Sequence, residues 1–216
     1  MIVHGRKFYV PSLLLLVTVL LAACQIGPGE YGAAKAETMA TSRVNVHLFS
    51  DSEVAIDGAT SALNRRADGI DLVLDTTGLT PGDAYTVWWL IFNNPADCAD
   101  IPCSSADLSN PRTMGMVAYA TGGIANEQGE GHFVATLAVG DTSNALDNGD
   151  GFPLELIETT LGLVDPQRAE IHAVIRTHGA AHPDPIEQLT TFGGGCNPAC
   201  ANVQAAFHSP QALAQN

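Results

Sequence analysis

Apolar and polar residues alternate with a period of two from about residue 43 onward, which is typical of strands that bury one face. Val44, Val46 and Leu48 alternate with polar neighbours, and Ile70 to Leu74 follows the same pattern. Tyr85 to Phe92 is apolar on both faces, so it predicts a central strand that is covered on both sides. The same pattern predicts further strands at 114–120, 132–139, 169–177 and 203–208.

Residues that favour turns separate these segments. Between the expected strands 114–120 and 132–139 lie Gly122, Gly123, Asn126 and Gly129, so we expect these two strands to form a pair. Only Leu154 to Leu161 has a helical pattern, and no alternation of strands with helices is present. The sequence therefore predicts an all-β fold: an antiparallel Greek-key β-sandwich in a single domain, 43–210, with at most one short helix. A closed barrel is the alternative.

One local motif supports the sandwich. The segment that contains Leu79, Pro81 and Tyr85 resembles the tyrosine corner of fibronectin type III domains, which are immunoglobulin-like β-sandwiches. The resemblance implies that the Tyr85 hydroxyl bonds to the backbone a few residues upstream, with Leu79 packed beneath it. Pro81 and Gly82 suit the turn. The resemblance covers eight residues, Gly78 to Tyr85, and implies a corner between sheets.

The same turn also resembles the one that precedes the metal-binding strand of copper/zinc superoxide dismutases. In that family the following strand carries two histidines that bind copper. Here the following strand, Tyr85 to Trp89, contains no histidine. The sequence therefore predicts no dismutase activity.

The N-terminus has the layout of an export signal. Arg6 and Lys7 precede an apolar run, Val10 to Leu21, that is shorter than the ~20 residues of a spanning helix. The run ends in Leu21-Ala22-Ala23-Cys24, which resembles the lipobox of bacterial lipoproteins. The resemblance implies a cleaved signal peptide over 1–23 and acylation, including a palmitate-type chain, at Cys24.

A lipidated Cys24 would hold the protein on a membrane outside the cytoplasm, on the outer membrane or the cell surface. Residues 24–42 are rich in glycine and alanine and predict a flexible tether, and 211–216 predict a C-terminal tail. The chain has 23 acidic residues against nine Lys and Arg, so it lacks the basic footprint of a nucleic-acid-binding protein.

Four cysteines remain besides Cys24, and an even number in an exported chain predicts two disulfides. We favour the local pairings, which join Cys98 to Cys103 and Cys196 to Cys200, because each closes a loop that contains proline. A zinc site built from all four thiolates is the alternative. No C-x-x-C motif is present, which argues against redox catalysis.

The segment 170–184 is the main candidate for a metal site. Alternation places Glu170, His172, Val174, Arg176 and His178 on one face of a strand, and the opposite face is apolar. His172 and His178 lie ~20 Å apart along an extended strand. The best ligand group is therefore His178, His182 and Asp184, with His172 or His208 as further candidates for binding zinc or copper.

A calcium site at Asp141 to Gly151 is a weaker candidate. The segment is rich in oxygen donors, but Leu146 stands where an EF-hand loop needs its first aspartate. Trp88 and Trp89 point to opposite faces, and we expect both in the core, although one could instead bind a sugar or a partner. The sequence thus predicts a non-catalytic binding or structural module of the cell envelope, with a protein or glycan as partner and no cofactor. The alternative is a metal-binding exported protein.

Overall fold

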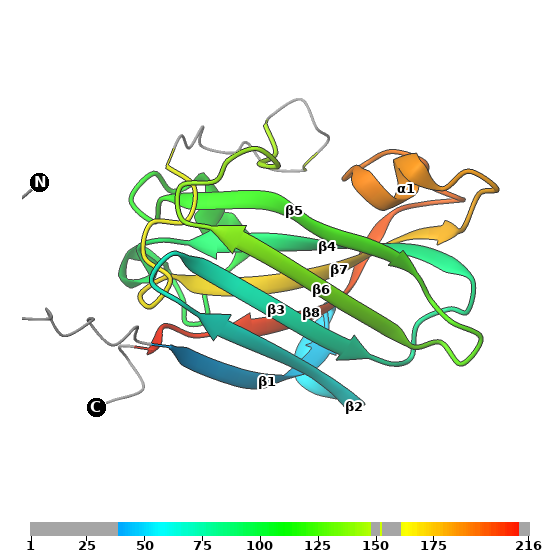
Figure 1. Cartoon of the computed structure of the whole chain (residues 1–216), viewed down its shortest axis with the longest axis horizontal. Helices are drawn as coiled ribbons and strands as arrows, with labels where there is room; N and C mark the ends of the chain where they lie inside the picture. Colours follow the sequence, from blue (N-terminus) through cyan, green and yellow to red (C-terminus); the bar gives the residue numbers. More distant parts are fainter. Residues whose placement is uncertain (1–38, 148–151, 153–160, 212–216) are drawn as a thin grey trace, which may run out of the picture. The chain divides into compact units, whose positions relative to one another are not determined.

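Eight antiparallel strands form one sheet in the part of the chain that the structure describes (Figure 1). In this computed structural model the described residues are 39–147, 152 and 161–211, and they belong to one compact unit, Glu37–Asn216. Several predicted segments lie outside the described residues: the signal peptide, the tether up to residue 38, residues 148–151 of the calcium candidate, residues 154–160 of the helix expected at 154–161, and the tail from residue 212. No described helix is long and apolar enough to cross a membrane.

The strands are β1 (Ala40–Leu48), β2 (Asp51–Arg65), β3 (Gly69–Thr76), β4 (Asp83–Phe92), β5 (Gly115–Ile124), β6 (Gly131–Ala138), β7 (Glu170–Ala180) and β8 (Ala201–His208). Two short 3-10 helices, η1 (Pro95–Asp97) and η2 (Ser105–Ser109), lie between β4 and β5, and the α-helix α1 (Ile186–Thr190) lies between β7 and β8. β1 begins at Ala40, two residues before the predicted end of the tether at residue 42.

The order of strands in the sheet is β5-β4-β7-β8-β1-β2-β3-β6. The sheet has two halves of four strands, and a short ladder between β1 and β8 connects them, with His47 opposite Ala205 and Leu48 opposite Gln204. The sheet curls until its two end strands, β5 and β6, come into contact. The predicted all-β antiparallel fold is confirmed. The predicted Greek-key sandwich of two separate sheets is not, because one continuous sheet has a barrel-like course.

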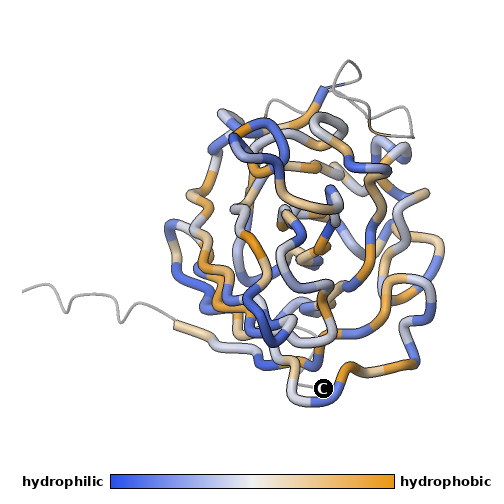
Figure 2. The backbone as a smooth tube through the Cα atoms, turned by 90° about the vertical axis from the view of Figure 1, so that its right-hand side faces the viewer, coloured by the Kyte–Doolittle hydropathy of each residue, from blue (hydrophilic) through white to orange (hydrophobic). Residues whose placement is uncertain are grey.

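Apolar side chains inside the curled sheet form the main core. Figure 2 looks along the strands and shows the backbone closing around the interior that these side chains fill. Many of them are completely buried, among them Leu63, Ile70, Leu72, Leu74, Trp89, Ile91, Leu163 and Ile171. They come from both halves of the sheet, so this core holds the two halves together.

β4 is buried on both faces, as its sequence predicts. Val87, Trp89 and Ile91 point into the main core. Trp88, Leu90 and Phe92 belong to a second apolar cluster on the outside of the sheet, together with Leu108, Val174 and Phe192. Trp88 and Trp89 are therefore both core residues, 1% and 0% exposed, on opposite faces of one strand. A second covering layer must exist outside this half of the sheet.

Two expectations about strands need correction. β2 was not predicted at all, because its second half is made largely of small and polar residues such as Ala59, Ser61 and Ala62. It nevertheless pairs with β1 and β3, which fix its conformation on both sides. The strands expected at 114–120 and 132–139 do not pair with each other. β5 pairs with β4 and β6 pairs with β3, because the chain crosses between halves at this turn.

The corner between β3 and β4 carries the chain from one half of the sheet to the other. The Thr80 backbone N–H donates to the Tyr85 hydroxyl at 2.9 Å, and Leu79 and Tyr85 both pack into the main core. Gly82 lies in the left-handed region at φ 78°, which glycine adopts without strain. This is the geometry that the tyrosine-corner resemblance implies.

Arg65, at the end of β2, closes one end of the domain. The side chain is completely buried, and its guanidinium donates to the carbonyl oxygens of Pro166, Ala169, His208 and Ser209. Burial lowers the pKa of Arg65 to about 10, although the negative charges of Asp165 and Glu170 partly oppose this shift. One cation thus joins β2 to the segment before β7 and to the end of β8.

We predict that Arg65→Met lowers the free energy of unfolding by at least about 3 kcal/mol, because it leaves several buried carbonyl groups without donors. Arg65→Lys is expected to restore little of this, since an ammonium cannot reproduce the planar fork of the guanidinium. Chemical denaturation measures both. Exposed Arg43→Met is the matched control, and it should change stability by no more than about 0.5 kcal/mol. Equal losses in the two Met variants would contradict the role assigned to Arg65.

Candidate functional site

The outer face of β7 organises the candidate site. Five side chains alternate along this face, as the sequence predicts: Glu170, His172, Val174, Arg176 and His178. They do not form a solvated face. Two loops, each closed by a disulfide, cover the two ends of the row, and Val174 in the middle lines a cavity.

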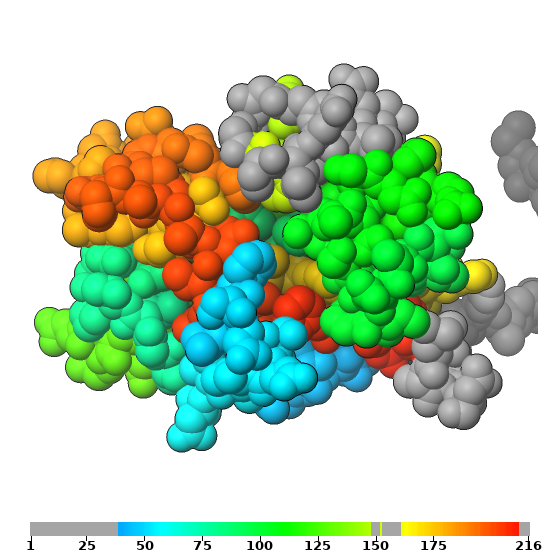
Figure 3. Space-filling view, turned by 180° about the vertical axis from the view of Figure 1, so that it is seen from behind, coloured from blue at the N-terminus to red at the C-terminus, as the bar shows by residue number. Residues whose placement is uncertain are grey.

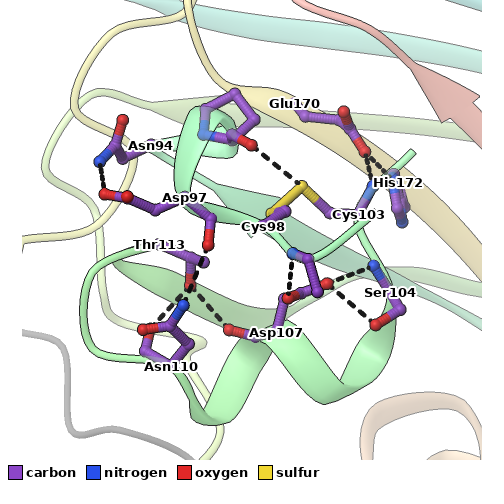
Figure 4. The surroundings of a disulfide bond; sticks show 12 residues. Asn94, Asp97, Cys98, Cys103, Ser104, Asp107, Asn110, Thr113, Glu170 and His172 are labelled. Atoms are coloured by element: carbon purple, nitrogen blue, oxygen red, sulfur yellow. Dashed lines mark hydrogen bonds and ion pairs between the residues drawn. A yellow bond between two sulfur atoms is a disulfide. The ribbon is translucent and has the colours of Figure 1, made fainter. Parts of the chain in front are cut away.

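The first covering loop follows β4 and is closed by the Cys98–Cys103 disulfide, with Cα atoms 5.4 Å apart (Figure 4). The Asp107 carboxylate organises it by accepting from the backbone N–H groups of Ala99 and Ser104 at 2.9 and 2.8 Å and from the Ser104 hydroxyl at 2.9 Å. Burial alone would raise the pKa of Asp107, but these hydrogen bonds outweigh it and hold the pKa below its usual value. The loop therefore has an internal hydrogen-bonded frame besides its disulfide.

Glu170 and His172 lie beneath this loop. The Glu170 carboxylate accepts from the Cys103 N–H at 2.6 Å and lies 2.7 Å from His172 Nε2 (Figure 4). The His172 ring packs against Phe92 and Phe207, with ring centroids 5.1 and 4.7 Å away. Both side chains are almost completely buried, so the pair anchors the loop to β7 and does not face solvent.

The second covering loop runs from α1 to the Cys196–Cys200 disulfide, whose Cα atoms are 5.1 Å apart. Gln188, which is completely buried, ties α1 to β7: its Oε1 accepts from His182 N at 2.7 Å and its Nε2 donates to Ala180 O at 3.1 Å. Gly179 has φ 77°, and a Cβ there would lie 1.7 Å from Asn197 O. Only glycine lets the disulfide loop approach β7 so closely. Both local disulfide pairings favoured by the sequence are present.

His178 is completely buried beneath this second loop. Trp88 Nε1–H donates to Thr86 Oγ1 at 2.7 Å, and Thr86 Oγ1 lies 3.0 Å from His178 Nε2. Because the indole can only donate and the Gly194 carbonyl can only accept, the consistent assignment has Thr86 O–H donating to Nε2 and Nδ1–H donating to Gly194 O at 2.9 Å. Burial lowers the pKa of His178. The hydrogen bond to Gly194 O opposes this shift, and the positive charge of Arg176 lowers the pKa further. The ring is therefore neutral.

A hollow opens between the two covering loops (Figure 3). In Figure 3 it lies among the orange segment around α1, the green first loop and the cyan β1–β2 turn. Its inner part is a cavity of ≈ 220 Å³ with a largely apolar lining: Phe49, Trp88, Leu90, Ser105, Phe152, Val174, Phe192 and Asn202. Apolar surface that stays accessible to a small molecule is the ordinary feature of a ligand site.

An open, more polar pocket of ≈ 690 Å³ adjoins this cavity and shares Trp88 and Phe192 with it. Hydrogen-bonding groups surround it, among them Asn144, Glu187 and Thr191. Tyr119 also lines the pocket, and its hydroxyl donates to Leu189 O at 2.7 Å, which ties β5 to α1. The hollow therefore has a strongly apolar inner part and a more polar outer part.

Arg176 is the cation beside the hollow. Its Nε donates to Phe192 O at 2.8 Å, its Nη1 donates to Asn202 Oδ1 at 2.9 Å, and its guanidinium lies 4.1 Å from the centre of the Phe192 ring. Among the described residues no carboxylate lies within ion-pair distance of it. Burial lowers the pKa of Arg176 from its usual value. The guanidinium is thus a half-buried positive charge with no negative partner in the described part of the chain.

The structure does not bring the predicted metal ligands together. His182 and Asp184 are exposed, whereas His178 is buried and bonded to Thr86 and Gly194. His172 pairs with Glu170, and His208 lies between the Ser42 and Ser61 hydroxyls at 2.8 and 2.9 Å. Within the described residues, the group whose ligand atoms do converge, within 4.8 Å of one another, is His178, Cys196 and Cys200.

The sequence did not reveal this hollow or the position of Arg176 next to its lining residues Phe192 and Asn202. Phe49, Trp88, Val174 and Phe192 come from four separate segments of the chain, so no local motif could mark them. The sequence feature that could have indicated it is the apolar outer face of Tyr85 to Phe92. An apolar face of a sheet has to be covered, and here loops cover it. Comparison with known protein families, with characterised proteins and with solved structures finds no match for this chain.

We predict that His208 makes the protein less stable as the pH falls from about 6.5 to about 3. Burial, with a smaller contribution from the charges of Arg65 and His172, lowers the pKa of His208 to about 3, whereas the unfolded chain binds this proton near pH 6.5. The unfolded state is therefore favoured as the pH drops through this window, by roughly 5 kcal/mol in total.

Denaturation at a series of pH values tests this. His208→Gln should flatten the pH dependence of the unfolding free energy between pH 6.5 and 3, besides lowering stability throughout. His132→Gln is the matched control, because His132 is 65% exposed and bonds only to Asp75 at the surface. An unchanged slope in His208→Gln would show that His208 does not control the acid sensitivity.

Proposed function

We propose that this chain is a lipid-anchored, extracytoplasmic binding module that holds a small organic anion with an apolar body in the hollow beside β7. The observation that carries the proposal is the combination of an apolar cavity with the Arg176 guanidinium, which bonds to two lining residues, Phe192 and Asn202, and has no carboxylate partner among the described residues. A non-catalytic role is favoured because the acid–base groups of this face, Glu170, His172 and His178, are covered and bonded to protein partners.

The apolar part of the ligand would occupy the cavity over Leu90, Val174 and Phe192. Burial of apolar surface supplies the main gain in free energy on binding, at roughly 25 cal/mol per Å². The walls are held by two disulfides and by the hydrogen-bonded frames around Asp107 and Gln188. A cavity with such walls loses little conformational entropy when a ligand enters.

The anionic group of the ligand would lie near Arg176. A half-buried guanidinium without a carboxylate partner in the described ranges is unusual in a chain with a net charge of −14, where negative side chains are abundant. A carboxylate or phosphate presents the oxygen pairs that the planar guanidinium recognises. The negative field of the whole chain repels anions at long range, so an apolar body is needed to favour entry.

Attachment to a membrane rests on the lipobox-like segment that ends at Cys24. The acidic surface would keep a tethered domain in solution near the membrane. A ligand-binding domain held there by acyl chains would capture molecules that pass close to the cell surface. The alternative function, metal binding by His178, His182 and Asp184, gains no support from their separate environments.

We predict that the protein binds one equivalent of anilinonaphthalene sulfonate, an apolar dye that carries an anion, with saturable fluorescence. Phe49→Ala should weaken binding about tenfold, because Phe49 forms part of the apolar lining and is itself 40% exposed. Arg176→Gln should weaken binding of this dye about tenfold but leave binding of a neutral apolar dye such as Nile red unchanged.

Matched control variants lie away from the hollow. Val134→Ala removes an apolar side chain that is 54% exposed on β6, and Arg43→Gln removes an exposed charge on β1. Neither should change the affinity for either dye. Non-saturable fluorescence, or equal effects of the site and control variants, would refute a ligand site in the hollow.

We also predict that Cys24→Ser abolishes incorporation of labelled palmitate and moves the protein from the membrane fraction to the soluble fraction of the expressing bacterium. Replacement of Cys24 leaves no sulfur for the acyl-glycerol group at this position. Cys98→Ser serves as the control, because it removes another cysteine and should leave acylation unchanged. Labelling that persists without Cys24 would disprove the anchor.

A further inference from the structure

We propose that reduction of the Cys196–Cys200 disulfide creates a binding site for one thiophilic d10 cation, zinc or cuprous ion, held by Cys196, Cys200 and His178. The proposal does not depend on the ligand proposed for the hollow. Within the described part of the chain, these three residues form the group whose possible ligand atoms all lie within 4.8 Å of one another. Two thiolates and an imidazole are the ligand types that zinc and copper prefer.

The distances suit a metal. His178 Nδ1 lies 3.2 Å from Cys200 Sγ while the disulfide is closed. With metal–sulfur bonds of about 2.3 Å and a metal–nitrogen bond of about 2.0 Å, neighbouring ligand atoms in a tetrahedral site lie roughly 3.5–3.8 Å apart. The nitrogen and this sulfur are therefore almost at the required separation, and reduction has only to let the two sulfurs move apart. Gly193, Gly194 and Gly195 precede Cys196 and give the backbone freedom to follow.

The surroundings of His178 suit a metal ligand as well. When Nδ1 binds a cation, it loses its proton and its hydrogen bond to Gly194 O. Nε2 then carries the ring proton and donates to Thr86 Oγ1, which is already 3.0 Å away. Such an outer partner fixes the orientation of a ligand histidine and strengthens its binding. Burial favours the neutral imidazole, which is the form that binds metals.

Reduction of the Cys196–Cys200 disulfide requires a reductant, and a dithiol can supply the electrons and protons. The dithiol transfers two electrons and two protons to the Cys196–Cys200 disulfide, which becomes two thiols, and the dithiol becomes a cyclic disulfide. Binding of the cation then releases the two thiol protons. The oxidised loop has no thiolate to offer, so metal binding and the disulfide exclude each other.

The experiment compares two double variants of the full-length protein, each with one of the two cysteine pairs. Cys98→Ser/Cys103→Ser keeps the proposed site, and Cys196→Ser/Cys200→Ser keeps a pair with no imidazole bonded to it. Each is titrated with Zn²⁺ and, separately, with Cu⁺ against a chromogenic chelator, before and after reduction with dithiothreitol and removal of the reductant under argon. We expect the reduced first variant to bind one equivalent at least a hundredfold more tightly than its oxidised form or the reduced second variant.

His178→Gln in the first variant should weaken binding at least tenfold. A measurement on the unmodified chain guards against misfolded variants: after reduction, Co²⁺ should give the thiolate-to-cobalt charge-transfer absorption and tetrahedral visible bands of a site with two sulfurs. Equal affinity in both double variants, no effect of His178→Gln, or reduced unmodified chain without that absorption would each overturn the proposal.

Discussion

The outer side chains of β4 and β7 are the constraint on which the rest of this structure depends. Trp88, Leu90 and Phe92 on β4, with Val174 on β7, form an apolar surface on the side of the sheet opposite to the main core. Water cannot solvate such a surface without a large cost in free energy. A second layer has to cover it, and this fold builds that layer from loops.

Loops are poor covers unless something fixes them, because their backbone groups need hydrogen-bond partners and their chain entropy opposes order. Each loop over β7 meets both demands with a short disulfide and one buried polar side chain, Asp107 in the first and Gln188 in the second. Ionisable residues at the two ends of the β7 face become anchors for these loops. The middle, around Val174, is left accessible between them.

This arrangement connects stability with function. The disulfides that stabilise the covering layer also set the walls of the hollow. The Cys196–Cys200 disulfide places a sulfur next to His178. The redox state of this disulfide would decide whether this end of β7 is covered by a fixed loop or binds a metal. Arg65 and His208 serve a different purpose at the end of the main core, where buried polar groups join strands that are distant in the sequence.

Much of the fold could be predicted from the period-two pattern. Seven of the eight strands were expected from it, including the double-sided burial of Tyr85 to Phe92, because alternation reports directly on burial. β2 was not predicted because Ala, Gly and Ser have little preference for strands. Its extended conformation is fixed by pairing with β1 and β3. The prediction that β5 pairs with β6 was also wrong. A short turn usually joins two strands of a hairpin, but here packing in the core places β5 beside β4 and β6 beside β3.

The candidate site was less predictable. The sequence placed Glu170, His172, Arg176 and His178 on one face, and it favoured both disulfide pairings, because these relations are local. It predicted metal ligands at the end of this strand and in the loop that follows, at His178, His182 and Asp184. Which loop covers which end of β7 depends on contacts between segments far apart in the chain, such as Cys103 with Glu170, which are 67 residues apart.

The sequence by itself determined the all-β class, the strand that is buried on both faces, the local disulfides and the corner at Tyr85, because each is decided by neighbouring residues. Tertiary structure alone decided that one sheet curls upon itself, that a hollow lies over Val174, and that Cys196, Cys200 and His178 meet. These features depend on distances between segments far apart in the chain, and packing around a shared core sets those distances.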